Sequence, residues 1–222
     1  MVLDLAEALG IREQRDAESA VVHLFGDHLE SLPPHLRERV RVLNDGSLDG
    51  AGEFILVWLH HAVRGHENPA IDAALHLADA LDQPVIAYQG LGGNHRFNSD
   101  RHHTFILEGA RDAARELAER GVRHVMHLPS EPATRSPLRD LARRATAIIT
   151  EDFPAPPFPA WTAALASATH RPFCVVDTAC VVPMKLVDQP YERAFKFRNR
   201  TRKLYKQRIG RPWSEAPPNT HD

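Results

Sequence analysis

Cysteine is scarce in this sequence, and long apolar runs are missing. The 222 residues include only Cys174 and Cys180, which cannot form a disulfide framework and favour a reducing compartment. No stretch approaches the roughly 20 apolar residues of a membrane-spanning helix. The amino terminus has no basic region ahead of its apolar residues, so no secretory signal is visible. These absences predict a cytoplasmic protein without a membrane partner.

Common catalytic and nucleotide-binding motifs are absent as well. The sequence has no GxxxxGK[ST], HExxH or GxSxG, and the glycines of residues 90–93 have the wrong spacing for GxGxxG. Among the 14 histidines, His60, His61 and His66 lie close together. Adjacent histidines point in different directions from a strand or a helix, so we expect no metal site. Motifs and individual reactive residues therefore identify no catalytic site in the sequence.

What the sequence does contain is an alternation of short apolar runs with amphipathic stretches. Continuous apolar runs are typical of strands in a sheet that is covered on both faces, and the alternation favours right-handed parallel crossovers. The pattern predicts an α/β, doubly wound, Rossmann-like domain with a five-stranded parallel sheet and helices on both faces. The expected strands are 54–59, 85–88, 122–128, 147–150 and 173–176, and the expected helices centre on 71–81, 105–117, 138–145 and 161–168.

The hydrophobic pattern and the distribution of charge divide the chain into three parts. Residues 1–52 have weak helical patterns around Pro33-Pro34 and are predicted to form an amino-terminal helical extension. Residues 53–183 carry the α/β pattern. Residues 184–222 are predicted to form a linker-like tail with a basic helical segment.

Open α/β sheets bind ligands beyond the carboxyl ends of their strands, near the switch in strand order. Polar loops follow the first and fourth predicted strands. The acidic pair Glu151-Asp152 suits a ligand carboxylate or a general acid, or else an N-cap for the next turn. The candidate ligand-binding residues are His60, His61, Arg64, Glu67, Asn68, Asp152 and Phe153.

The tail carries a concentrated positive charge. Eight Lys or Arg residues and no acids lie between Lys196 and Arg211, with aromatic residues interleaved. Such a segment suits contact with a nucleic-acid backbone, and it equally suits packing of a basic helix on the acidic remainder of the chain. The nucleic-acid candidates are Arg198, Arg200, Arg202 and Lys203.

Five motifs, in order, resemble the photolyase/cryptochrome family and are most similar to class II DNA photolyases. Residues 64–70, RGHENPA, resemble the family's R-x-x-[DE]-N-P/W-A signature after the first strand. The other four similar segments are RVRVLN at 39–44, RHHTFILEG at 101–109, EDF at 151–153 followed by Trp161, and VDTACVVP at 176–183.

The resemblance implies the amino-terminal α/β domain of a photolyase, which carries an antenna chromophore, a folate or a deazaflavin, where one is used. The family's FAD, its electron-conducting tryptophans and its lesion pocket belong to a carboxy-terminal helical domain. FAD is therefore not expected to be held by this chain alone. Three departures affect antenna binding and domain docking: His61 replaces a polar pair, residues 155–157 lack an arginine, and residues 178–180 differ from D-A-H-N.

Taken together, these observations favour a photolyase-like domain without the catalytic half. Its predicted role is to bind an antenna chromophore or a nucleotide-like ligand, or to dock with a separate FAD-binding domain, in light-dependent DNA repair. If the chain is part of a complete photolyase, the parent reaction is the light-driven carbon–carbon cleavage of cyclobutane pyrimidine dimers. Two alternatives remain: a small-molecule enzyme that uses Asp152, Arg64 and His61, and an accessory module that binds DNA.

Overall fold

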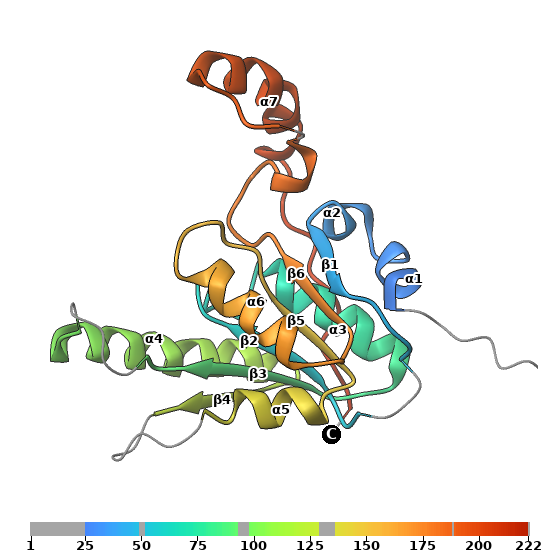
Figure 1. Ribbon diagram of the computed structural model, residues 1–222, viewed down its shortest axis with the longest axis vertical. Coiled ribbons are helices and arrows are strands. Elements are labelled where there is room, and N and C mark those ends of the chain that lie inside the picture. The colour runs from blue at the N-terminus through green and yellow to red at the C-terminus, as the bar shows by residue number, and fades with distance from the viewer. Residues whose placement is uncertain (1–24, 49–51, 93–97, 129–135, 188, 222) are drawn as a thin grey trace, which may run out of the picture.

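A six-stranded sheet forms the centre of the molecule (Figure 1). The computed structural model describes residues 25–48, 52–92, 98–128, 136–187 and 189–221. The strand order is β1-β6-β5-β2-β3-β4. The strands are β1 (Val40–Asn44), β2 (Ile55–Leu59), β3 (Val85–Gly90), β4 (Val122–His127), β5 (Ala147–Glu151) and β6 (Phe173–Val176). The doubly wound α/β class predicted from the sequence is confirmed.

The five predicted strands correspond to β2 through β6, and the pairings among these five are all parallel. The predicted number of strands was one too few. Strand β1 lies at the edge and pairs antiparallel with β6, with Val40 opposite Val176. It arises from the region 1–52 that we expected to be helical. Its residues alternate incompletely between buried and exposed, because an edge strand needs cover on only one face.

The helices cover both faces of the sheet. On one face, Ile55 and Val57 pack against α3 (Pro69–Leu81), together with Leu117 of α4 (Asp100–Glu119). Two short helices, α1 (Phe25–Glu30) and α2 (Pro34–Arg37), join this core. On the other face, Leu56 and Ile148 pack against α5 (Leu138–Arg144) and α6 (Phe158–Ala168). Alternate residues of β2 therefore serve two separate cores, as its continuous apolar run requires.

Local signals set the ends of the two long helices. Asn68 caps α3, because its Oδ1 accepts a hydrogen bond from the Ala70 amide, and Pro69 occupies the first turn. Ser99 caps α4 in the same way by accepting from His102. After α4, Gly121 has a φ of +68°, and a Cβ there would lie 2.0 Å from the Asn219 carbonyl oxygen. Glycine is thus required at this turn for both conformation and space.

The segment 184–222 divides into three pieces. A short 3₁₀ turn, η2 (Met184–Leu186), leads to α7 (Ala194–Arg208), which projects away from the sheet (Figure 1). Residues 213–221, hereafter the C-terminal strap, return to the α/β body. There the Asn219 amide donates to the Arg120 carbonyl at 2.9 Å. The domain boundaries predicted at 52–53 and 183–184 therefore run between segments that touch each other. Strand β1 and the strap both lie outside the predicted α/β domain, 53–183, and both contact it.

No helix among the described residues combines the length and apolar character needed to cross a lipid bilayer.

Candidate functional site at the switch in strand order

The order of the strands reverses between β2 and β5. From β2 the chain proceeds outward through β3 and β4, and it then returns to the other side of β2 to form β5 and β6. The loops that follow β2 and β5 therefore meet at the carboxyl edge of the sheet, where doubly wound folds bind ligands. These are the two loops that supply the candidate ligand-binding residues.

Glu151, the last residue of β5, occupies the centre of this edge. Its buried carboxylate accepts hydrogen bonds from three consecutive backbone amides, those of His60, His61 and Ala62, at 2.7, 2.6 and 2.5 Å. The Thr178 hydroxyl donates to the same carboxylate at 3.3 Å. A row of convergent amides is an anion-binding arrangement. Here the protein's own carboxylate fills the place that a ligand phosphate would take.

His60 is buried directly beside this carboxylate. Its Nδ1 lies 3.4 Å from Glu151 Oε2, and its ring stacks on Phe158 with centroids 4.7 Å apart. Trp58 contacts the His60 ring edge-on at 5.2 Å. Burial lowers the pKa of His60, and the negative charge of Glu151 opposes that shift only in part. His60 is therefore an uncharged ring in the wall of the site near neutral pH.

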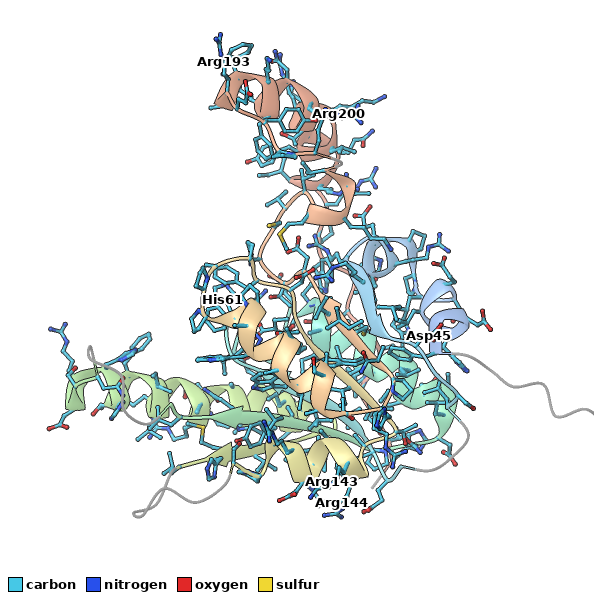
Figure 2. All side chains as sticks on the ribbon, in the orientation of Figure 1. Asp45, His61, Arg143, Arg144, Arg193 and Arg200 are labelled. Atoms are coloured by element: carbon cyan, nitrogen blue, oxygen red, sulfur yellow. The ribbon has the colours of Figure 1, made fainter. Side chains whose placement is uncertain are left out.

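Further aromatic rings extend from His60 toward solvent. We call His61, Phe153, Phe158 and Trp161 the aromatic patch. His61 stacks on Phe153 with centroids 3.8 Å apart, and Phe158 contacts both Phe153 and Trp161 edge-on at 5.4 and 5.5 Å. His61 and Trp161 are exposed, and Figure 2 shows His61 beside the loop that leads into α6. The patch thus offers ring surfaces to an external planar group.

A hollow of about 340 Å³ lies next to the aromatic patch, between β1 and α6. Asp152 and Arg41 line it and form an ion pair, with Arg41 Nη2 3.0 Å from Asp152 Oδ1. The Arg41 side chain remains about half exposed. The hollow therefore has one apolar side, from Phe153 and α6, and one charged side.

The remaining three candidates hold the loop after β2 in shape. Arg64 donates to the carbonyls of Glu67 and Thr178 at 3.0 and 3.3 Å. Buried Asn68 donates to the carbonyls of Ala62 and Arg64, both at 2.9 Å. The Glu67 amide donates to the Glu215 carboxylate of the strap at 2.5 Å. Arg64 and Asp152 are thus engaged with different partners, and the small-molecule enzyme that would use both stays a prediction.

Arg198, Arg200, Arg202 and Lys203 lie elsewhere, on α7. All four side chains are exposed, and Figure 2 shows Arg200 on the projecting helix, well apart from His61. The predicted nucleic-acid residues and the predicted ligand-binding residues therefore form two separate surfaces.

The described residues contain no group of three or more His, Cys, Asp or Glu that is placed to hold a metal ion. Both cysteines are free; burial raises the pKa of Cys174, and burial together with Asp177 raises the pKa of Cys180 to about 11. Neither thiol is poised as a nucleophile. Part of the glycine-rich loop, residues 93–97, lies outside the described residues.

The sequence-based list of ligand-binding residues omitted Arg41, Glu151 and Phe158. Glu151 belongs to the acidic pair that the sequence singled out, but its three amide partners come from another loop. Arg41 lies on the strand that was missed. A charged residue at the carboxyl end of a largely apolar strand was the signal available for Glu151, because such a position requires buried hydrogen-bond donors.

Comparisons with known proteins agree with the motifs. The family model for DNA photolyase matches residues 55–219. A deoxyribodipyrimidine photo-lyase from Methanothermobacter thermautotrophicus is 32% identical over 155 residues, which are 70% of this chain and 34% of the relative. The chain thus spans about a third of the length of that relative.

Among solved structures, the universal stress protein from Archaeoglobus fulgidus in complex with dAMP matches with a TM-score of 0.40 and 18% identity, over 57% of this chain and 99% of that one.

The family model covers well over half of the sequence and includes both loops at the switch in strand order. The protein described here belongs to the DNA photolyase family.

Proposed function

We propose that this chain is the light-collecting α/β domain of a DNA-repair photolyase and that it binds a planar antenna chromophore, a folate or a deazaflavin, over the aromatic patch. Membership of the family supports the connection with light-dependent repair. Cleavage of a pyrimidine dimer takes an electron from reduced flavin, chemistry that the cofactor supplies when an FAD-binding domain holds it. The residues of this chain contribute binding and orientation of the pigment.

The observation that carries this proposal is the aromatic patch beside the hollow at the switch in strand order. Stacking on His61 and Phe153 favours a flat conjugated ring, with each aromatic pair worth about 0.5–1.5 kcal/mol beyond the area it buries. The hollow between β1 and α6 can accept one edge of such a ring. Arg41 is half exposed, and an acidic substituent on the ligand would share its guanidinium with Asp152.

The position of Glu151 supports a chromophore rather than a nucleotide held by its phosphate. A phosphate at the amides of residues 60–62 would have to displace a carboxylate that already accepts all three of their hydrogen bonds. Two anions at one site repel each other strongly in a buried environment. The ligand that fits is therefore recognised by its ring.

Reconstitution tests the proposal. Purified protein is mixed with a deazaflavin or a folate and passed through a desalting column, and retained pigment is measured by its absorption band and its fluorescence quenching. We expect one pigment per chain, and a loss of affinity of about tenfold in the double variant His61→Ala/Phe153→Ala from two lost ring contacts. Phe105→Ala, at an exposed ring on α4, is the matched control. Failure to retain either pigment, or equal binding by the patch variant and the control, would refute the proposal.

A second measurement concerns the flavin. If FAD belongs to a partner domain, whether in the same polypeptide or separate, this chain incubated with FAD should emerge from the column without a flavin band. Stoichiometric FAD retained by residues 1–222 would contradict the assignment of light collection to this domain.

A further inference from the structure

Helix α7 forms an arm that extends beyond the α/β body (Figure 1). The segment from Arg193 to Arg211 contains no acidic residue. Among the residues that the structure describes, ten aromatic or large apolar side chains are exposed, and four of them, Phe195, Phe197, Tyr205 and Ile209, lie on or next to this helix. We call Ala194–Arg208 the basic arm.

One face of the basic arm is turned toward the protein. Phe197, Thr201, Leu204 and Arg208 recur at the spacing of one helical face. Thr201 is only 6% exposed, and Arg208 forms an ion pair with Glu38 at 2.5 Å. Tyr191 contacts the Phe197 ring edge-on at 6.0 Å. These contacts fix which side of the helix points away from the body.

The far side and the two flanks of the helix, hereafter its outer face, carry almost only positive charge. Its six basic residues are all exposed: Lys196, Arg198, Arg200, Arg202, Lys203 and Lys206. Five of them, all except Arg200, form no ion pair with any other described residue, so their charge is not neutralised by the acidic body. The helix rises about 1.5 Å per residue, so the six charges are spread over roughly 15 Å. This face is therefore a compact strip of positive potential.

We infer that the outer face of the basic arm binds the phosphate backbone of DNA. The cores of protein–protein interfaces are depleted of lysine and of acidic residues but not of arginine, and three of the six basic residues here are lysines, which disfavours an ordinary protein partner. Duplex DNA, in contrast, presents about one negative charge per 1.7 Å of its axis, a density that a strip of this kind matches. Phe195, 55% exposed on the same face, adds a ring that can lie against a sugar or an unstacked base.

Such contacts position the protein without selecting a sequence. The arm is remote from the aromatic patch, so the inference is independent of pigment binding and concerns a different ligand. A duplex held by the arm would be bound whether or not it contains a lesion.

Fluorescence anisotropy with a labelled, undamaged 20-base-pair duplex tests the inference across 50–200 mM NaCl. We expect a Kd between about 10⁻⁴ and 10⁻⁶ M near physiological salt, and a log–log salt slope of about −4.5 to −5.4 from five or six phosphate contacts. The triple variant Arg198→Glu/Arg202→Glu/Lys203→Glu should bind at least tenfold more weakly and lose about 2.7 from the magnitude of that slope. These side chains are exposed, and far-ultraviolet circular dichroism checks that the fold is kept.

The matched control is Arg101→Glu/Arg111→Glu/Arg139→Glu, at three exposed arginines on α4 and α5. It changes the net charge by the same amount, so we expect less than a threefold loss of affinity and an unchanged slope. Equal losses in the two triple variants would show that net charge alone attracts DNA and would overturn the inference. No binding at 50 mM NaCl would also overturn it and would leave an acidic protein surface as the arm's partner. Neither result bears on pigment retention.

Discussion

The carboxylate of Asp72 on α3 lies 2.6 Å from a guanidinium nitrogen of Arg120, and the two side chains are 0% and 3% exposed. Asp72 also accepts hydrogen bonds from the Trp213 indole at 2.6 Å and the Ala216 amide at 2.9 Å. Arg120 in turn donates to the carbonyls of Gly65 and Ala216, both at 2.9 Å. One buried ion pair thus joins α3, the end of α4, the loop after β2 and the C-terminal strap.

Replacement of Asp72 should be among the most damaging substitutions in the protein. Asp72→Asn leaves Arg120 buried without its counter-charge, and breaking a buried pair in this way costs about 3–5 kcal/mol. We expect that fall in the free energy of unfolding from urea titration followed by circular dichroism. Asp79→Asn, at an exposed position on the same helix, is the control and should change stability by less than about 0.5 kcal/mol. A similar small effect for Asp72→Asn would contradict the described network.

Removal of the Glu151 carboxylate should convert an internal contact into an anion site. Glu151→Ala leaves three amides without an acceptor, so we expect a loss of stability of about 2–4 kcal/mol. Phosphate or sulfate can then occupy the vacated position, and the Tm of the variant should rise with phosphate concentration. The native protein and Asp152→Ala should show no such phosphate-specific rise in thermal melts at constant ionic strength. Equal responses from all three proteins would mean that the amides of residues 60–62 do not form an anion site.

The lowered pKa of His60 predicts a loss of stability in mild acid. The unfolded chain takes up a proton at this histidine near pH 6.5, whereas the folded protein does so only at lower pH. The contribution of His60 to the free energy of unfolding should therefore fall as the pH drops below about 6.5. His60→Phe keeps a ring between Trp58 and Phe158 and should lose less stability between pH 7 and pH 5.5. His61→Phe, at the exposed neighbour, should keep most of the pH dependence in the same urea titrations, because burial is the largest cause of the lowered pKa of His60 and the charge of His61 the smallest.

His66 should respond to pH in the opposite sense. Glu215 of the strap, Glu119 and Glu116 raise its pKa, with the Glu215 hydrogen bond the largest cause. The stabilisation is fully present below the unfolded pKa near 6.5 and is lost as the pH rises through the folded value. In NMR titrations, His66 should titrate above and His60 below the ordinary histidine value. The exchange rate of the Glu67 amide proton, divided by its intrinsic rate, should depend on pH in the native protein and should lose that dependence in His66→Ala. An unchanged pH profile in the variant would contradict the pairing of His66 with Glu215.

The sequence predicted the parts of the fold whose signal is repeated along the chain. Strands β2 through β6 are continuous apolar runs because helices cover both of their faces, and α3 repeats its apolar residues once per turn. Strand β1 was missed because Arg41 faces solvent and the Asn44 side chain donates to the Ala166 carbonyl, which interrupts the apolar pattern. The strap was missed because its contacts depend on single residues with no periodicity.

The candidate site was predicted at the level of its loops. The rule for open α/β sheets placed the residues after β2 and β5 at one edge, and the strand order agrees. The individual role of each side chain could not be predicted in the same way. Arg64 and Asn68 turn toward backbone carbonyls, and Glu151 rather than Asp152 turns inward, because the partners that decide these orientations come from distant parts of the sequence.

The smallest fragment of this protein that folds should include the C-terminal strap. A truncation after α7 would remove the indole and amide donors that share the Asp72 carboxylate with Arg120, and it would take away Ala216, which is 5% exposed and packs in the core beside α3. The arm is consequently a projecting segment that is attached to the body on both sides. Before it, Lys185 donates to the Val40 carbonyl, and after it, Trp213 donates to Asp72. A force that a bound partner exerts on the arm would reach the sheet through these two anchors and through the Arg208–Glu38 ion pair, and trimming the polypeptide to its Rossmann-like sheet would remove the Trp213 anchor.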